Sequence, residues 1–121
     1  MPKVIDDPVT RILRVTKKTI LNRPGFSFTM EDIALQAEMS LPSIYSRFHG
    51  LSDLCYEVIR YSWAEETKRL KSLAKGCIDY KDLIITLLTF LHEFIVQYSF
   101  PFSKVKAEKK EEVEEIIQNT I

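Results

Sequence analysis

The sequence has little glycine, and its β-branched residues never alternate with polar ones over a long run. Only three of its 121 residues are glycine. Because half-buried strands need alternation of period two, both shortages argue against a sheet and favour an all-α fold. Hydrophobic residues make up 45% of the chain and charged residues 28%, so we expect a packed core and not a disordered chain.

Cysteines, a leader sequence and a membrane span are also scarce or missing. The two cysteines, Cys55 and Cys77, fall on helix positions and are interpreted as small apolar side chains of a reduced cytosolic protein. No basic-then-apolar signal opens the chain. The longest apolar stretch, residues 83–100, is interrupted by polar side chains, which is typical of a buried helix. We therefore expect a cytoplasmic protein that contacts no membrane.

The chain has no excess of either charge. Lysine and arginine together number 17, and so do aspartate and glutamate. The overall charge therefore gives no sign of a nucleic-acid partner. A DNA-binding protein with this balance must concentrate its few cations on one surface.

Motifs of catalysis and of metal binding are missing as well. The sequence has no Ser/His/Asp order of a hydrolase, no phosphate-binding loop and no metal-spaced set of cysteines and histidines. We expect no enzymatic activity, no cofactor and no metal site.

Hydrophobic periodicity predicts helices over six ranges. They are residues 7–22, 30–37, 41–48, 52–75, 80–99 and 104–120. Thr29 and Asp32 form a capping-box pattern before the second helix, and Gly25 can take a left-handed turn after the first. Pro101 is expected to end the fifth helix.

The second and third predicted helices are short and separated only by "EMS", residues 38–40. Two such helices, supported by a helix before them, are typical of a helix-turn-helix unit, whose second helix enters the major groove of DNA. Ser40 caps that helix, and Ile44, Tyr45 and Phe48 are predicted to form its inward stripe. The rest of "SLPSIYSRF" is left free to meet bases and phosphates.

Residues 11–59 resemble the N-terminal domain of the tetracycline-repressor (TetR) family of transcriptional regulators. The family pattern reads approximately I-L-x-A-A, G-[FY]-x-x-T-[TS], I-A-x-x-A-G-V-S-x-G-[TS]-[LI]-Y-x-[YH]-F and K-x-x-L. The positions that match are Ile12, Leu13, Gly25, Phe26, Thr29, Ile33, Ala34, Ala37, Ser40, Ser43, Ile44, Tyr45, Phe48 and Leu54. Three positions differ from the pattern: Glu38 and Pro42 replace glycines, and Leu51 replaces a lysine.

The resemblance implies a DNA-contacting role for seven residues. Thr29 and Tyr45 would contact phosphate, and Ser40 would cap the recognition helix and meet phosphate as well. Leu41, Pro42, Ser43 and Arg47 would lie at or near the bases.

The chemistry of these side chains supports part of that assignment. Arg47 can donate two hydrogen bonds to guanine, a contact that discriminates between bases by about 1–3 kcal/mol. For Tyr45, a core aromatic with a surface hydroxyl is the alternative to a phosphate contact. For the cations of the first helix, the alternatives are phosphate neutralisation and a solvated face. These cations are Arg11, Arg14, Lys17 and Lys18.

The second half of the chain is expected to mediate dimerisation. The helix over 80–99 is apolar almost all round, and such a helix must be enclosed on all sides. We predict a homodimer in which the last two helices pack against their mates, the alternative being a monomer that encloses the helix itself. His92 within this helix is interpreted as a hydrogen-bonded core histidine, and a metal or effector role is the alternative. The resemblance also implies a small-molecule effector.

These observations predict an all-α protein with two parts. Residues 7–51 would form the three-helix DNA-binding head, and residues 52–121 a shortened dimerisation and regulatory part of about three helices. The expected function is a homodimeric transcriptional regulator, a repressor, that binds double-stranded operator DNA. The alternative is a truncated relative that has lost DNA binding and pairs with another regulator.

Overall fold

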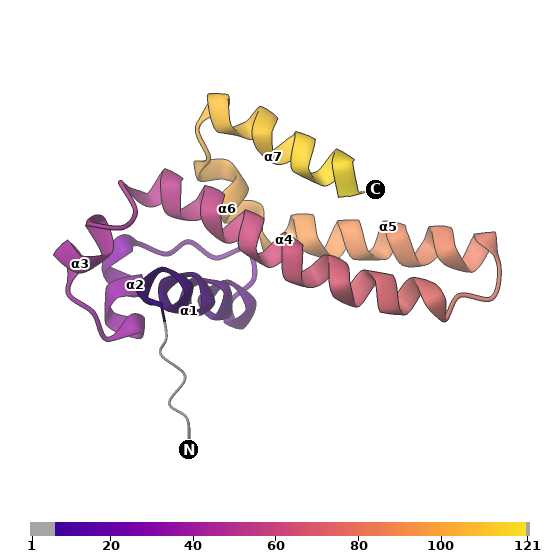
Figure 1. Ribbon diagram of the computed structural model, residues 1–121, viewed down its shortest axis with the longest axis horizontal. Coiled ribbons are helices and arrows are strands. Elements are labelled where there is room, and N and C mark those ends of the chain that lie inside the picture. The colour runs from indigo at the N-terminus through magenta and orange to yellow at the C-terminus, as the bar shows by residue number, and fades with distance from the viewer. Residues whose placement is uncertain (1–6, 121) are drawn as a thin grey trace, which may run out of the picture.

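The structure is a computed structural model that describes residues 7–120, apart from the side chain of Glu108. Within this range it is all-helical and contains no strand, so the all-α prediction is confirmed (Figure 1). Its helices are α1 (Pro8–Asn22), α2 (Met30–Ala37), α3 (Leu41–Tyr45), α4 (Leu51–Lys75), α5 (Tyr80–Gln97), α6 (Ser99–Lys104) and α7 (Ala107–Thr120).

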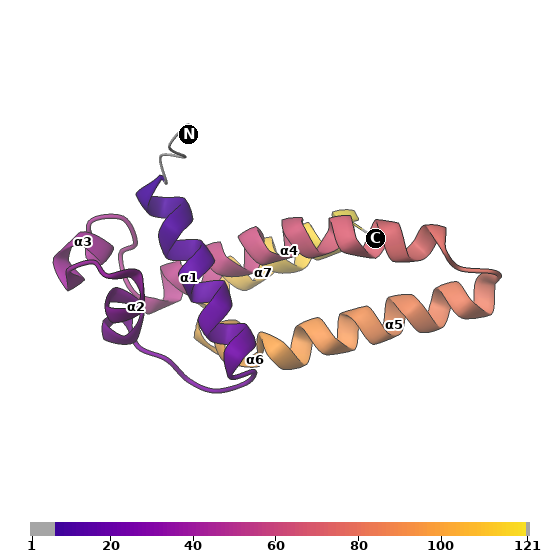
Figure 2. The same cartoon turned by 90° about the horizontal axis from the view of Figure 1, so that it is seen from below.

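The longest helix, α4, connects the two ends of the molecule. It packs against α1, α5, α6 and α7. Together α4 and α5 form a hairpin that projects along the longest axis of the molecule, while α2 and α3 lie at the opposite end (Figures 1 and 2). The proposed division between residues 51 and 52 falls at the first residues of α4.

One hydrophobic cluster runs through the molecule and includes buried side chains of every helix but α6, whose Phe100 and Phe102 pack against it. In the head it contains Ile12, Ile33 and Ile44, all fully buried. Where α4 meets α5 it becomes aromatic: the Phe94 ring stacks on Tyr98 with centroids 4.4 Å apart and meets Trp63 edge-on at 5.0 Å. Burying each such side chain contributes about 1.5–3 kcal/mol to folding. The cluster therefore gives the head and the hairpin one continuous core.

The prediction that Pro101 ends the fifth helix is wrong. The chain turns at Tyr98, and Pro101 lies in the first turn of a short helix, α6, that the sequence did not indicate. Proline has no N–H, so Pro101 cannot donate to the carbonyl of Gln97 four residues earlier. The N–H of Gly25 donates to that carbonyl instead, at 3.4 Å. The bend between α5 and α6 is thus hydrogen-bonded to the loop after α1.

Two hydrogen bonds hold α7 along α4. At its start, the N–H of Lys106 donates to the Ser52 hydroxyl at 3.1 Å. At its end, the indole N–H of Trp63 donates to the hydroxyl of Thr120 at 2.9 Å. Because the partners lie more than fifty residues apart, these contacts are tertiary and not helical. They fix the connection between α6 and α7 beside the first turn of α4.

Burial controls the titration of two groups in this core. It raises the pKa of the Cys55 thiol to about 12, although nearby Lys104 acts in the opposite direction. It also raises the pKa of Tyr98 to about 12, while the neighbouring Ser62 hydroxyl favours the ionised form. The Cys55 thiol therefore stays protonated at neutral pH and is a poor nucleophile. No helix between residues 7 and 120 is both long and apolar enough to cross a membrane.

Candidate nucleic-acid interface

The start of α2 is built by the capping box that the sequence indicates. The N–H of Asp32 donates to the Thr29 hydroxyl at 3.1 Å, and the N–H of Thr29 donates to the Asp32 carboxylate at 2.9 Å. Thr29 is exposed. Its hydroxyl oxygen accepts one hydrogen bond in this arrangement and keeps its own hydrogen for a donor role. Thr29 is therefore positioned to donate to a phosphate oxygen.

The turn between α2 and α3 is made by Glu38 in a left-handed conformation, with φ of 55° and ψ of 44°. The N–H of Met39 donates to the carbonyl of Ala34 at 3.0 Å, which closes the end of α2 in a Schellman-type arrangement. A left-handed residue other than glycine costs about 1–2 kcal/mol. The Glu38 carboxylate lies 3.8 Å from the Arg11 guanidinium. Glu38 brings negative charge to the turn, and its ion pair occupies the guanidinium group of Arg11, one of the cations of the head.

The beginning of α3 is capped by Ser40. Its hydroxyl accepts from the N–H of Ser43 at 3.3 Å and lies 2.8 Å from the Ser43 hydroxyl. Pro42 follows as an exposed residue in the first turn, and Leu41 is half-buried against the core. Ser40 therefore has the capping role that was expected, and the Pro42 ring faces outward.

The α3 helix ends at Tyr45, three residues earlier than predicted. The Ser46 hydroxyl donates to the Ser43 carbonyl at 2.7 Å and draws that carbonyl away from the helical pattern. The backbone nevertheless continues to turn, because the N–H of Phe48 donates to the Ile44 carbonyl at 2.9 Å. The polar surface of residues 40–48 therefore lies partly on the short helix α3 and partly on the turn that follows it.

Tyr45 is not part of the inward stripe. Ile44 and Phe48 are buried, as expected, but Tyr45 is 45% exposed. Residues 44 and 48 stack above one another on a helix, whereas position 45 is rotated by about 100° from position 44. The interpretation of Tyr45 as a core aromatic is therefore wrong, and its ring is available at the outer surface.

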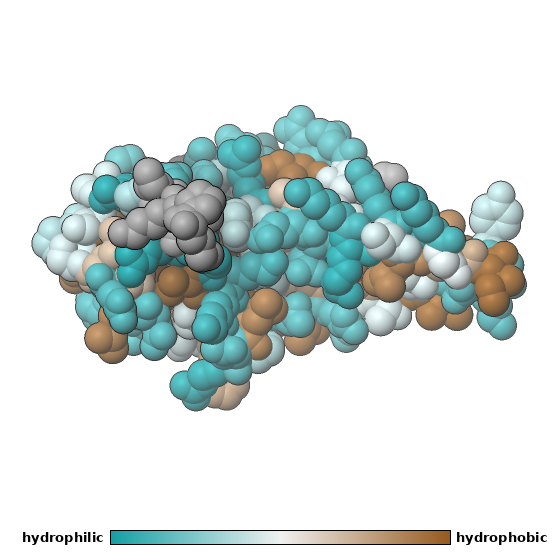
Figure 3. All heavy atoms as spheres, turned by 60° about the horizontal axis from the view of Figure 1, so that its bottom comes forward, coloured by the Kyte–Doolittle hydropathy of each residue, from teal (hydrophilic) through white to brown (hydrophobic). Residues whose placement is uncertain are grey.

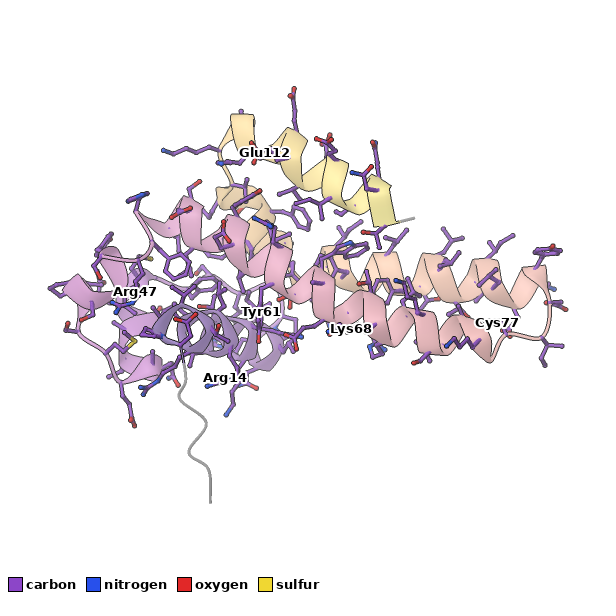
Figure 4. The ribbon with its side chains drawn as sticks, viewed as in Figure 1. Arg14, Arg47, Tyr61, Lys68, Cys77 and Glu112 are labelled. Carbon is purple, nitrogen blue, oxygen red and sulfur yellow. The ribbon has the colours of Figure 1, made fainter. Side chains whose placement is uncertain are left out.

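Arg47 is exposed in the turn after α3, and its guanidinium group is held against Ser43 of α3 and against Ser46 (Figure 4). One guanidinium nitrogen donates to the Ser43 carbonyl at 3.1 Å and to the Ser46 hydroxyl at 3.0 Å. Each exposed bond of this kind contributes about 0.5–1.5 kcal/mol at most. Arg47 can therefore leave this position when a stronger acceptor, such as a guanine edge, is offered.

Lys17 does not lie on a solvated face, because its side chain is only 16% exposed. Its ammonium group lies 3.4 Å from the carboxylates of both Glu65 and Glu66 on α4. This pairing ties α1 to α4. Burial and the neighbouring Glu65 carboxylate raise the pKa of Tyr61 on α4, and the charge of Arg14 on α1 opposes that rise only in part. Both Arg14 and Tyr61 are labelled in Figure 4.

Two lysines that the sequence did not single out lie next to the head. Lys106, just before α7, and Lys109, in the first turn of α7, line a hollow of about 420 Å³ with residues 49–53. The ammonium group of Lys109 lies 5.0 Å from the centre of the Tyr56 ring and 3.4 Å from the Glu112 carboxylate. These cations stand beside Leu51, where the family pattern has a lysine. No local signal could have found them, because they lie more than fifty residues away along the chain.

Among residues 7–120, no three histidine, cysteine or acidic side chains come together in a way that could hold a metal ion. The geometry thus brings together Ser40, Ser43 and Arg47 through hydrogen bonds, with Pro42 and Tyr45 exposed beside them. Thr29 is exposed at the start of α2. A scan against protein-family models and a search of curated proteins found no match to this chain.

Proposed function

We propose that this chain is a DNA-binding transcriptional regulator, a repressor similar to the TetR family, that binds duplex DNA through residues 29–48 as a homodimer. The observation that carries the proposal is the division of side chains around α3. Ile44 and Phe48 point into the core, whereas Pro42, Tyr45 and Arg47 are exposed. A polar, hydrogen-bonding outer side with a single arginine fits a major groove, where arginine pairs with guanine.

The phosphate contacts would come from both sides of this segment. Thr29 has a hydroxyl hydrogen to donate, and Tyr45 presents its exposed ring and hydroxyl beside α3. The family pattern has a lysine at the position of Leu51, in the first turn of α4. In this chain Lys106 and Lys109 lie beside that turn and would supply the positive charge instead. Phosphate contacts of this kind fix the position of the protein on DNA and leave sequence discrimination to Arg47.

A homodimer would read two half-sites related by a two-fold axis. Recognition helices of dimeric helix-turn-helix proteins meet half-sites separated by about one helical turn of DNA or a multiple of it. Occupation of such an operator blocks access to the promoter. Support for dimerisation comes from α5, which is apolar on both faces and covered on only one.

The test is a binding-site selection from random duplexes, followed by titration of the selected duplex over a range of salt concentrations. Arg47→Ala should lose sequence discrimination. Lys106→Ala should weaken binding to all sequences about equally and reduce the salt slope by about one. Lys75→Ala, at the far end of α4, is the matched control and should change neither. Failure of the parent protein to enrich any sequence would contradict the proposal.

A second candidate function is an interaction protein that has lost DNA binding and pairs with another regulator. The observation that favours it is the engagement of the head's cations by the chain itself. Arg11 pairs with Glu38, Lys17 pairs with Glu65 and Glu66, and Arg47 is bonded to α3. Co-purification of a heterodimer that shifts no DNA in a gel would favour this function over the first.

A further inference from the structure

The surface of α4 beside α7 differs in kind from the apolar surface of α5. Hydrophobic residues gather at the end of the molecule where the α4–α5 hairpin lies (Figure 3). His92 on α5 is exposed as well, so its interpretation as a core histidine is wrong. On α4, next to the last turn of α7, the exposed side chains are instead cationic. Neither the dimer contact nor the DNA-binding head proposed above makes use of them.

The cations lie on one stripe of α4. Arg60, Lys68 and Lys71 are exposed and line a groove of about 580 Å³ between α4 and the last turn of α7. Positions 60, 64, 67, 68 and 71 lie on the same side of a helix, because they follow one another at helical spacing. At 1.5 Å per residue the stripe is about 16 Å long. A small anion therefore cannot contact all three cations at once.

These three cations form no ion pair with the side chains that the structure describes. The guanidinium group of Arg60 lies 6.0 Å from the centre of the Tyr56 ring. By contrast, Glu66 on α4 pairs with both Arg69 and Lys17. No glutamate of α7 is among the described residues that line the groove. The groove thus has positive charge that the described chain leaves uncompensated, and such charge favours an acidic partner.

The groove also has apolar contact surface and a wall that is held in place. Ala64 is small and exposed, so it leaves room for another backbone to approach α4, and Ile116 of α7 lines the same groove. The indole N–H of Trp63 donates to the Thr120 hydroxyl at 2.9 Å and holds the end of α7 beside α4. Asn119 is exposed, and its amide bonds to no described residue. A groove formed in advance lowers the cost of binding.

We propose that this groove binds an acidic amphipathic helix of a partner protein. Carboxylates at intervals of three and four residues on that helix pair with Arg60, Lys68 and Lys71. Its apolar edge rests on Ala64 and Ile116. Amphipathic helices are the segments that grooves between helices commonly bind. The inference does not depend on DNA binding, because Lys68 lies midway along α4 and Arg47 lies at the end with the head (Figure 4).

The first experiment selects peptides that bind the purified full chain from a display library of random sequences. Peptides about 16 residues long contain more than four helical turns, enough to cover the stripe. Sequences with aspartate or glutamate at intervals of three and four residues should be enriched. The double variant Lys68→Glu, Lys71→Glu should not enrich them, and circular dichroism verifies that it folds. A wild-type chain that enriches no acidic sequence would overturn the proposal.

The second experiment titrates a selected, fluorescently labelled peptide and follows its anisotropy. Combining Lys68→Ala with Lys71→Ala should raise the dissociation constant about tenfold. Lys81→Ala, at an exposed cation on α5 outside the groove, is the matched control and should leave it unchanged. Ala64→Phe keeps every charge but fills the groove, and it should weaken binding by a similar factor. Binding that survives Ala64→Phe would show attraction to exposed charge alone and overturn the groove.

Two further measurements separate the acidic helix from nucleic acid. Single-stranded DNA that displaces the peptide from the groove at equal charge concentration would assign the groove to polyanions in general and overturn the proposal. Arg47→Ala should leave peptide binding unchanged. A chain that binds the acidic peptide but selects no duplex would retain the groove and reject the proposed function. A chain that selects a duplex but binds no acidic peptide would reject the groove alone.

Discussion

The two ends of this molecule both present uncovered surface, but the two surfaces differ in kind. At the head, residues 40–48 present polar groups that bond to one another and to their own backbone. At the hairpin, α5 presents large apolar side chains with no such internal partner. A polar surface can remain solvated at little cost, whereas the apolar surface gains free energy whenever it is covered. The head is therefore suited to reversible recognition, and the hairpin to a lasting contact.

The largest expected effect comes from removing the aromatic support that the two surfaces share. Phe94→Ala deletes a buried ring between Trp63 and Tyr98 and should lower the free energy of unfolding by about 3–5 kcal/mol. Urea denaturation measures it. Phe26→Ala, at an exposed phenylalanine of the head, should change stability by no more than about 0.5 kcal/mol. Equal losses in the two variants would show that the hairpin is not anchored by this cluster.

Alkaline pH should next weaken the junction between hairpin and head. The pKa of Tyr98 rises from 10.0 to about 12 on folding, so the unfolded chain releases this proton first. The contribution of Tyr98 to the free energy of unfolding is complete below pH 10 and is lost as pH rises to about 12, a loss of about 3 kcal/mol in all. In the Tyr98→Phe variant, the midpoint of urea denaturation should fall less steeply between pH 10 and pH 12 than in the wild-type chain. An unchanged slope in the variant would assign the decline to other groups.

A smaller effect should separate the two surfaces functionally. Arg47→Ala should reduce discrimination between the selected duplex and a single-base variant of it by about 1–3 kcal/mol. It should leave the dimer dissociation constant unchanged, because Arg47 lies at the opposite end of the molecule from α5 (Figure 4). Fluorescence anisotropy and sedimentation measure the two quantities. Equal weakening on both duplexes would mean that Arg47 contacts phosphate and not a base.

The smallest effect concerns the turn of the head. Glu38→Gly relieves a left-handed backbone but adds freedom to the unfolded chain, for a net gain of about 0.5–1 kcal/mol. It also releases Arg11 and should tighten DNA binding. Glu38→Ala removes the same charge without relieving the strain, so it should tighten binding but not raise stability. A stability gain in both variants would contradict the strain at this residue.

Local rules predicted the helices of the head with useful accuracy. The capping box of Thr29 and Asp32, the cap of Ser40 and the left-handed Gly25 all occur where the pattern indicates. The predictions for the head are wrong where a side chain has more than one possible local orientation or hydrogen-bond partner. Tyr45 faces outward, and α3 stops early because the Ser46 hydroxyl bonds to the preceding turn. The assignment of the head to DNA binding stays a prediction.

What the sequence by itself determined is the helices other than α6 and the caps of α2 and α3, because periodicity and capping act over a few neighbouring residues. Only the tertiary structure decided which distant groups meet. It placed the N–H of Gly25 on the carbonyl that Pro101 leaves unbonded, Lys17 against Glu65 and Glu66, and Lys106 beside the start of α4. Such contacts depend on how whole helices pack around the core, and no window of adjacent residues contains that information.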